Sequence, residues 1–449
     1  MRRRVTQTHG APAPTRRPRR DEVLALHQTI GNRRVARLFE PSAPASTASP
    51  CCGDEVIQRK IGFELETGIP ITIECRDDKY RDPNVLTDGW KQPVPGGHNL
   101  MADHSPGHVR QDPGDFDQWP IVEFVSKPVS DTQDPDDFDA QATKWVNLLG
   151  RIRNLMNGTP PPKQLSDVVS AATPAKSIGY VDNQTKTGDR GPNSVSVQYT
   201  FGAQLAKMNQ VFLSLSKVAD NTGGGKSIWE KAAALKTASD NVERMVPALT
   251  KKFPTYSTKL FEGKASKTAK KQQGATELAD VRGYLEMVSA YLVAGSTVSS
   301  RGYVKNRVGI FFKSKLSTVR NKLVAENPYA ATLFTVPGNR TWVKAKLMAV
   351  NNRAAGEDLF EGMNDPTVSA WIDEVFGGTD DRVFEAARNP WSTEIQPGKV
   401  KGKRAAVMEM RTPGTVFSAN AAFDLNADRP AIVAYLRRLF EANQAAQGL

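Results

Sequence analysis

Glu64 and Glu66 stand two residues apart in segment 61–67, whose alternation of apolar and polar residues predicts a β-strand. Side chains two apart on a strand share a face, so both glutamates point away from Phe63 and Leu65. A single pair of this kind usually belongs to a solvated outer face. The pair would indicate a functional site only if other strands placed acidic side chains on the same face.

Three later segments alternate in the same way, and they span 121–126, 195–200 and 406–412. Gln198 and Thr200 share a face of their strand, and Glu409 and Arg411 share a face opposite two methionines. Glu123 differs, because its neighbours on the same face are isoleucine and valine. A carboxylate in that setting needs a cation, a metal or a hydrogen-bond donor.

The four strands would form a chemically coherent surface if they were neighbours in one antiparallel sheet. One face would then carry four carboxylates, an amide, a hydroxyl and a guanidinium. Such a set of acids favours Mg²⁺, a hard ion that binds carboxylates and phosphates. Arg411 would add a planar donor for phosphate or carboxylate. This combination is what phosphoryl transfer from ATP to a carboxylate requires, and amine attack on the acyl phosphate then gives an amide.

The order of these segments resembles the amidoligase branch of the glutamine synthetase and gamma-glutamylcysteine synthetase superfamily. In that family an E-x-E strand opens the sheet, another Glu follows, a His or Gln strand comes next, and an E-x-R strand closes the site. Segment 61–66, IGFELE, looks like the opening "GxExE" strand, and segment 122–128, VEFVSKP, looks like the "E-[FIL]-V-[ST]-x-P" segment.

The resemblance implies an α+β fold with a curved, mostly antiparallel sheet of the glutamine-synthetase-like type. Helices would pack on one face, and a helical insertion would span about 203–298. ATP and Mg²⁺ or Mn²⁺ would be the cofactors. The implied metal ligands are Glu64, Glu66, Glu123 and Glu409.

Arg411 would contact the transferred phosphate in this scheme. Gln198 and Thr200, which share a face of their strand, would also belong to the catalytic site. Gln198 stands where many family members carry His. Lys313 and Arg320 belong to a basic stretch before the last strand, where related enzymes keep cations for the nucleotide phosphates. The alternative for this stretch is a solvated face beside a core element.

Three of the five histidines fall between residues 98 and 108. We expect Asp103, His104 and His108 to lie on a loop beside the active site that grips the substrate, because the surrounding segment is rich in Gly and Pro. The alternative is a zinc site in a metal-dependent hydrolase, although the H-x5-H-x3-H spacing fits no standard zinc motif.

The N-terminal leader has its own organisation. Residues 1–20 are Arg- and Pro-rich and are expected to be disordered, 21–40 to form an amphipathic helical docking segment, and 41–55 to be a linker before the catalytic domain, 56–449. Within it, 26–38 is similar to the "LQxxxGNxAVxRL" segment that precedes bacterial enzymes and toxins associated with contractile injection systems. The resemblance implies export or delivery as injection-system cargo, through contacts of 21–40, after the cytoplasmic synthesis that the low cysteine content favours.

Composition limits the partners. The formal net charge is +12, of which the first 40 residues carry +7, so the remainder gives little reason to expect nucleic-acid binding. The sequence lacks an apolar run long enough to span a membrane. The three cysteines, Cys51, Cys52 and Cys75, form no disulfide framework.

The expected partners are a carboxylate and an amine from an amino acid, a peptide or a protein. The alternative function is a non-enzymatic cargo or interaction protein on a degenerate ligase fold.

Overall fold

The chain is described here from a computed structural model. The described residues are 60–75, 91–104, 120–155, 163–164, 177–181, 195–220, 226–253, 267–297, 310–360, 366–379, 396–411, 425 and 429–447. The predictions for the leader and the linker therefore lie outside the described residues.

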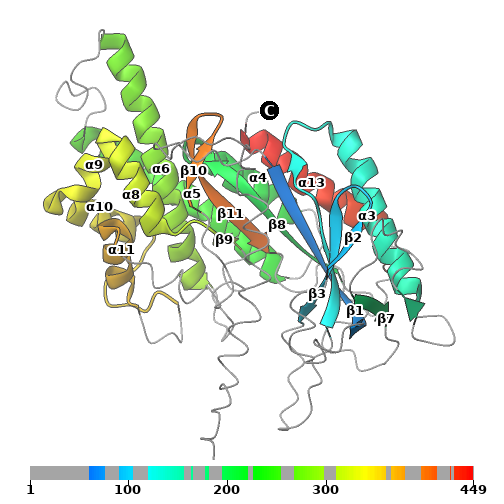
Figure 1. Ribbon diagram of the computed structural model, residues 1–449. Helices are drawn as coiled ribbons and strands as arrows, with labels where there is room; N and C mark the ends of the chain where they lie inside the picture. The colour runs from blue at the N-terminus through cyan, green and yellow to red at the C-terminus, as the bar shows by residue number, and fades with distance from the viewer. Residues whose placement is uncertain are drawn as a thin grey trace, which may run out of the picture.

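An antiparallel sheet forms the centre of the fold (Figure 1). Its main path runs β10–β11–β8–β1–β4–β3–β2, and every neighbouring pair on this path is antiparallel. In chain order the strands of this path are β1 (Lys60–Cys75), β2 (Lys91–Val94), β3 (His98–His104), β4 (Pro120–Val125), β8 (Val195–Gln204), β10 (Gly398–Val400) and β11 (Lys403–Arg411). The four strands predicted from alternation are confirmed as β1, β4, β8 and β11.

Short strands extend this path at several points. β5 (Val129–Ser130) and β7 (Ser177–Val181) pair with β1, β6 (Lys163–Gln164) pairs with β7, and β9 (Ile310–Phe312) pairs with β11. A two-residue turn with positive φ at Lys401 (52°) and Gly402 (71°) joins β10 to β11. Positive φ at both central residues is the geometry that a tight hairpin requires.

Helices cover the apolar face of the sheet. They are α3 (Pro135–Leu155), α4 (Met208–Asp220) and α13 (Arg429–Gln447), and η3 (Leu205–Lys207) leads from β8 into α4. Phe63 of β1 lies 5.4 Å from Phe138 and 5.9 Å from Trp145 of α3, measured between ring centroids, and Phe138 stacks on Phe440 of α13 at 4.3 Å. The face of β1 that carries Phe63 is therefore core, as its alternation predicts.

A helical body follows β8 and lies to one side of the sheet, at the left of Figure 1. It contains α5 (Lys226–Lys252), α6 (Lys267–Thr297), α8 (Leu316–Glu326), α9 (Pro328–Thr335), α10 (Pro337–Val350) and α11 (Val368–Gly377). Local chemistry sets the boundaries: the side chain of Asn327 accepts a hydrogen bond from the amide of Ala330, and Pro328 begins α9. α4, α5 and α6 occupy the region where helices were expected, whereas α8 to α11 were not expected.

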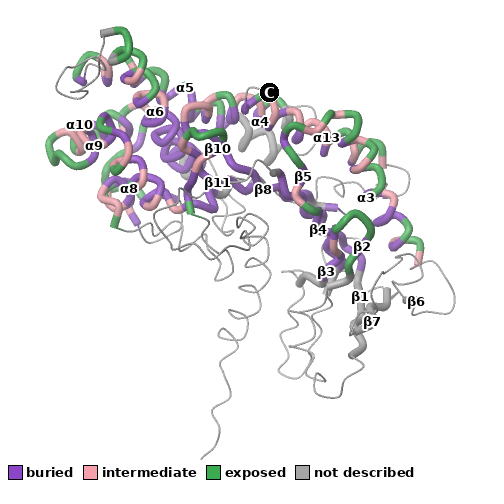
Figure 2. The backbone as a smooth tube through the Cα atoms, turned by 45° about the horizontal axis from the view of Figure 1, so that its top comes forward, coloured by how far each residue is buried: buried purple, intermediate pink, exposed green. Residues whose placement is uncertain are grey.

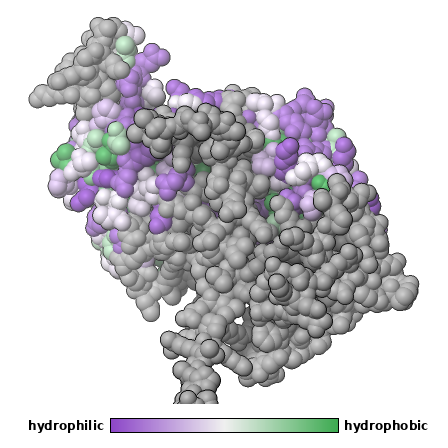
Figure 3. Space-filling view, viewed as in Figure 1, coloured by the Kyte–Doolittle hydropathy of each residue, from purple (hydrophilic) through white to green (hydrophobic). Residues whose placement is uncertain are grey.

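Burial follows this layering. Figure 2 shows buried residues along β8, β11 and β4 and exposed residues on the outer sides of α3, α10 and α13. In Figure 3 the described surface over α3 and over the helical body is mainly hydrophilic. Within the described ranges, no helix combines the length and the apolar character that crossing a membrane needs.

The prediction of a loop over 98–108 is wrong for its first part, because residues His98–His104 form β3. Gly96 and Gly97, with φ of 91° and 82°, make the turn between β2 and β3, so the glycines that indicated a loop belong to a hairpin. Leu100 pairs with Phe124 of β4, and both are fully buried. His108 lies outside the described residues.

Candidate functional site

The central row of the site crosses four strands. Glu64 of β1 lies opposite Gln198 of β8 on one side and opposite Val125 of β4 on the other. Gln198 in turn lies opposite Arg411 of β11. Residues directly opposite in an antiparallel pair lie on the same face of the sheet, so these register positions share one face.

Two further rows flank the first. Glu66 lies opposite Glu123 of β4, and Glu409 of β11 lies opposite Thr200 of β8. Each of these residues is two positions from a member of the central row, so all belong to the same face, which we call the carboxylate face. It is the face turned away from Phe63 and from the helices that pack on Phe63.

The carboxylate face is spread over several strands. Neighbouring strands lie about 4.8 Å apart, so the three steps from β11 to β4 cover about 14 Å. Glu66 and Glu123 are direct neighbours across a pair of strands, whereas Glu409 is two strands away from Glu64. These backbone separations exceed the coordination sphere of one ion.

Most of the side chains on this face are buried. The exposed fraction is 5% for Glu64, 8% for Glu123, 6% for Gln198, 1% for Thr200 and 1% for Glu409, and Glu66 is half-buried. Burial penalises a charged carboxylate unless a cation or donors compensate it. The Oε1 atom of Gln198 is buried and has no hydrogen-bond partner among the described residues.

Lys313 supplies a cation at one end of the carboxylate face, where its ammonium pairs with the carboxylate of Glu409 and both side chains are almost fully buried. Backbone pairing brings the two residues near each other, because Phe311 of β9 lies opposite Glu409 and Lys313 follows just after the end of β9. Ser314 holds the next position, since its Oγ accepts a hydrogen bond of 3.1 Å from the amide of Val407.

Arg320 is not brought to the carboxylate face by any of its described contacts. Its guanidinium donates to the carbonyl of Phe334 at 3.0 Å and to the side chain of Asn321 at 2.9 Å. Phe334 belongs to the last turn of α9, where the helix dipole favours a positive charge. Burial lowers the pKa of Arg320. These contacts favour a structural role in the helical body over phosphate binding.

His98 lies on the helix side of the sheet and does not join the acids. Its ring lies 5.5 Å from Phe124 and 5.3 Å from Trp145, between ring centroids. The amide of Lys127 donates to Nδ1 at 2.8 Å. Burial, together with the charge of Lys127, lowers the pKa of His98 to about 4, so the ring is neutral near pH 7.

The remaining residues of the predicted substrate loop are placed only by their backbone pairing. Asp103 and His104 lie opposite Ile121 and Pro120 of β4. Asp103 lies five residues after His98 on β3, so its register position alternates with that of His98 and belongs to the carboxylate face.

The donor set on the carboxylate face suits a hard divalent ion, because it consists of carboxylate and amide oxygens. In the part of the chain that the structure describes, no three His, Cys, Asp or Glu side chains are grouped closely enough to hold a metal ion by themselves. Mg²⁺ is usually bound through one or two carboxylates, with water and substrate phosphates completing its octahedron. The arrangement fits a metal of that kind and argues against a cage made of protein ligands alone.

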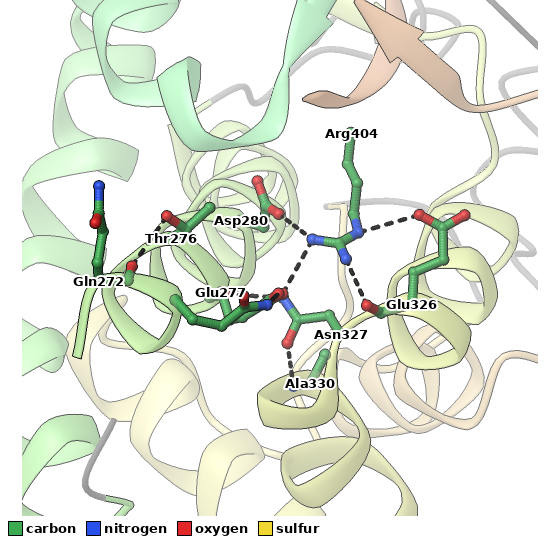
Figure 4. Close-up of polar contacts among 9 residues, drawn as sticks. Gln272, Thr276, Glu277, Asp280, Glu326, Asn327, Ala330 and Arg404 are labelled. Carbon is green, nitrogen blue, oxygen red and sulfur yellow. Dashed lines mark hydrogen bonds and ion pairs between the residues drawn. The ribbon is translucent and has the colours of Figure 1, made fainter. Parts of the chain in front are cut away.

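A second polar cluster, which the sequence did not indicate, joins β11 to the helical body (Figure 4). The guanidinium of Arg404 contacts Glu277 at 3.0 Å and Asp280 at 2.5 Å on α6, and Glu326 at 3.2 Å on α8. The side chain of Asn327 donates to the carbonyl of Glu277 at 2.9 Å. Burial raises the pKa of Asp280 despite the contact with Arg404. These residues come from three segments that are far apart in the sequence, and they match no motif, so only the fold reveals the cluster.

Comparison with known proteins gives only a distant likeness. The sequence matches no known family profile, and no curated protein matches it. Two solved structures of Vibrio cholerae toxins are similar to the fold: a mutant of a VgrG toxin ACD domain in complex with ADP and Mn⁺⁺, and a toxin from the MARTX/VgrG family. For each, identity is 13%, the TM-score is 0.40, and the alignment covers 81% of this chain and 96% of the other. A TM-score of 0.40 is too low for this likeness to decide the type of sheet or the activity.

Proposed function

We propose that this chain is a carboxylate–amine ligase that uses ATP and Mg²⁺ or Mn²⁺ on a sheet of the glutamine-synthetase-like type. The observation that carries the proposal is the register of four strands. It aligns Glu64, Glu66, Glu123 and Glu409 on one face with Gln198 between them. Buried acids in adjacent positions repel one another, and divalent cations offset that repulsion.

Each group on this face has a role in the proposal. Glu64, Glu66, Glu123 and Glu409 are the metal ligands, and the Oε1 of Gln198 offers a neutral oxygen beside them. Bound metal would neutralise the phosphates of ATP and hold them in line with the acceptor. Thr200, opposite Glu409, adds a hydroxyl for the same region.

Two cations serve the phosphates in this scheme. Arg411, opposite Gln198 in register, would contact the phosphoryl group in transfer. Lys313, which is already held against Glu409, would lie at the nucleotide end of the face. Arg320 is left out of the proposed site because its contacts lie within the helical body.

The reaction has two balanced steps. A carboxylate oxygen of the first substrate attacks the γ-phosphorus of ATP, the bond from that phosphorus to the bridging oxygen breaks, and ADP leaves with its electron pair. An amine then attacks the acyl carbon, loses a proton, and expels inorganic phosphate to give an amide. The product equals the two substrates less one water.

The test is a search for that product by mass spectrometry. The full chain is incubated with ATP, Mg²⁺ and pooled amino acids, peptides or cell lysate. We expect ADP, phosphate and species whose mass equals two components less 18 Da, which is the mass of one water. Glu64→Gln should slow their formation by about 10²- to 10³-fold, because it removes charge stabilisation at the transferred phosphate.

Glu243→Gln is the matched control, because Glu243 is an exposed glutamate that pairs with Arg282 on the helical body. It should leave the rate unchanged. Equal rates for the wild type and Glu64→Gln would contradict the proposal. Complete absence of ATP turnover with every substrate pool would favour the interaction protein on a degenerate ligase fold.

The carboxylate and the amine in this proposal each come from an amino acid, a peptide or a protein. Delivery as cargo through residues 21–40 stays a prediction from the sequence.

A further inference from the structure

A buried hydroxyl closes one end of the pairing between the acidic segments of β1 and β4. The amide of Phe63 donates to the Oγ of Ser126 at 2.9 Å, while the amide of Ser126 donates to the carbonyl of Phe63 at 2.8 Å. Phe63 directly precedes Glu64, and Ser126 directly follows Val125, the residue opposite Glu64. This side-chain bond therefore fixes the pairing at the first acid.

A second hydroxyl closes the other end. The register of β1 against β4 shifts between Glu66 and Pro70, so the backbone ladder is interrupted just after Glu66. There the Oγ1 of Thr67 donates to the carbonyl of Val122 at 2.7 Å and accepts a bond of 3.2 Å from the amide of Ile69. The side chain of Thr67 thus provides an inter-strand hydrogen bond at the point where the regular backbone pairing is interrupted.

Both hydroxyls are shielded from water and are separate from the chemistry. The exposed fraction is 0% for Thr67 and 1% for Ser126, so bonds to them are not exchanged for bonds to water. By alternation each points to the side of Phe63, away from the acids. They cannot touch a substrate on the carboxylate face, and any effect on it must pass through the backbone.

The segment between these bonds places two acidic residues opposite each other. Glu66 lies opposite Glu123, and like charges in directly opposite positions destabilise strand pairing. A slip by one residue would turn the acids towards the core face, which the apolar residues of β1 also resist. The bonds at Thr67 and Ser126 oppose the smaller distortion, in which β1 and β4 splay apart at the acids.

We propose that Thr67 and Ser126 are positioning residues that hold β1 and β4 in the pairing at which Glu64, Glu66 and Glu123 meet divalent cations. This inference rests on the proposed function. Groups that orient metal ligands without touching the metal typically change metal affinity by about 10- to 100-fold when they are removed.

The experiment measures Mn²⁺ binding to the full chain by electron paramagnetic resonance, with Mn²⁺ and a non-hydrolysable ATP analogue as the probe, because phosphates complete the coordination in the proposed site. Thr67→Val keeps the shape of the side chain and removes both hydrogen bonds, whereas Thr67→Ser keeps the oxygen. We expect Thr67→Val to weaken Mn²⁺ binding about 10-fold or more, and Thr67→Ser to restore most of it. Ser126→Ala should weaken binding in the same direction, and it carries the test if Thr67→Val does not fold.

Ser289→Ala is the matched control, because Ser289 donates a buried hydrogen bond of 2.8 Å to Asn351 within the helical body. It should lower Tm and leave Mn²⁺ affinity unchanged. If Thr67→Val and Ser126→Ala lower Tm but bind Mn²⁺ as the wild type does, the hydroxyls are only structural and the inference is wrong. If the wild type itself binds no Mn²⁺, the proposed function fails and the inference fails with it.

Discussion

At the scale of single residues, compensation of buried charge decides what the carboxylate face can do. Lys313 and Glu409 form an ion pair whose side chains are 2% and 1% exposed. The cost of desolvating such a pair roughly offsets the attraction between its members. Its clearest signature is therefore the effect of removing one partner, which leaves the other charge buried.

We expect Lys313→Met to destabilise the metal-free protein by about 3–5 kcal/mol, the usual cost of breaking a buried pair. Urea unfolding followed by circular dichroism measures the change. Lys236→Met is the control, because Lys236 pairs with Asp240 on the surface, where an ion pair adds little. A Lys313→Met protein as stable as the wild type would mean that the pair does not form.

At the scale of elements, β11 connects the carboxylate face to the helical body. Arg404 and Glu409 lie on the same strand, and Arg404 is bound by acids from α6 and α8 (Figure 4). The position of Glu409 along the face therefore depends on the packing of these helices. Arg404 is 18% exposed on its side chain, and Glu277 and Asp280 are each 4% exposed.

Arg404→Met should lower the free energy of unfolding by about 3–5 kcal/mol, because it leaves two buried carboxylates without their cation. Arg437→Met is the comparison, since Arg437 also contacts three carboxylates, Asp136, Asp139 and Glu441, but at the surface of α3 and α13. Its loss should be much smaller. Equal losses in urea unfolding would show that burial does not set the strength of the Arg404 cluster.

The sequence could predict the main strands of the site but not how they pair. Alternation identified β1, β4, β8 and β11, because one face of each strand is apolar core and the pattern is local. It also fixed which side chains within a strand share a face. It could not fix the register of Glu66 against Glu123, because pairing between distant segments depends on turns and irregularities such as the one after Glu66.

The wrong prediction of a loop over 98–108 also has a physical cause. It rested on the Gly- and Pro-rich composition of the segment, but glycines with positive φ equally make a hairpin turn, as Gly96 and Gly97 do. For Arg320, the basic segment indicates a cation but does not show which backbone carbonyls the guanidinium meets, so phosphate binding by Arg320 stays a prediction. The Arg404 cluster joins three distant segments and leaves no local pattern.

At the scale of the whole molecule, one sheet separates two environments. Its apolar face is closed by α3, α4 and α13, and its other face carries acids from three strands. Carboxylates that are buried in register across neighbouring strands destabilise a fold unless cations or hydrogen-bond donors compensate them. In the proposed ligase, the cations that compensate these acids are the metal ions that bind the phosphates of ATP.

The most direct test is to crystallise the full chain with Mn²⁺ and a non-hydrolysable ATP analogue and to locate Mn²⁺ by anomalous scattering. The account predicts Mn²⁺ peaks about 2.1 Å from carboxylate oxygens of Glu64, Glu66, Glu123 or Glu409, with the phosphates completing the coordination. Peaks confined to other parts of the molecule, or an analogue bound away from these four residues, would contradict it.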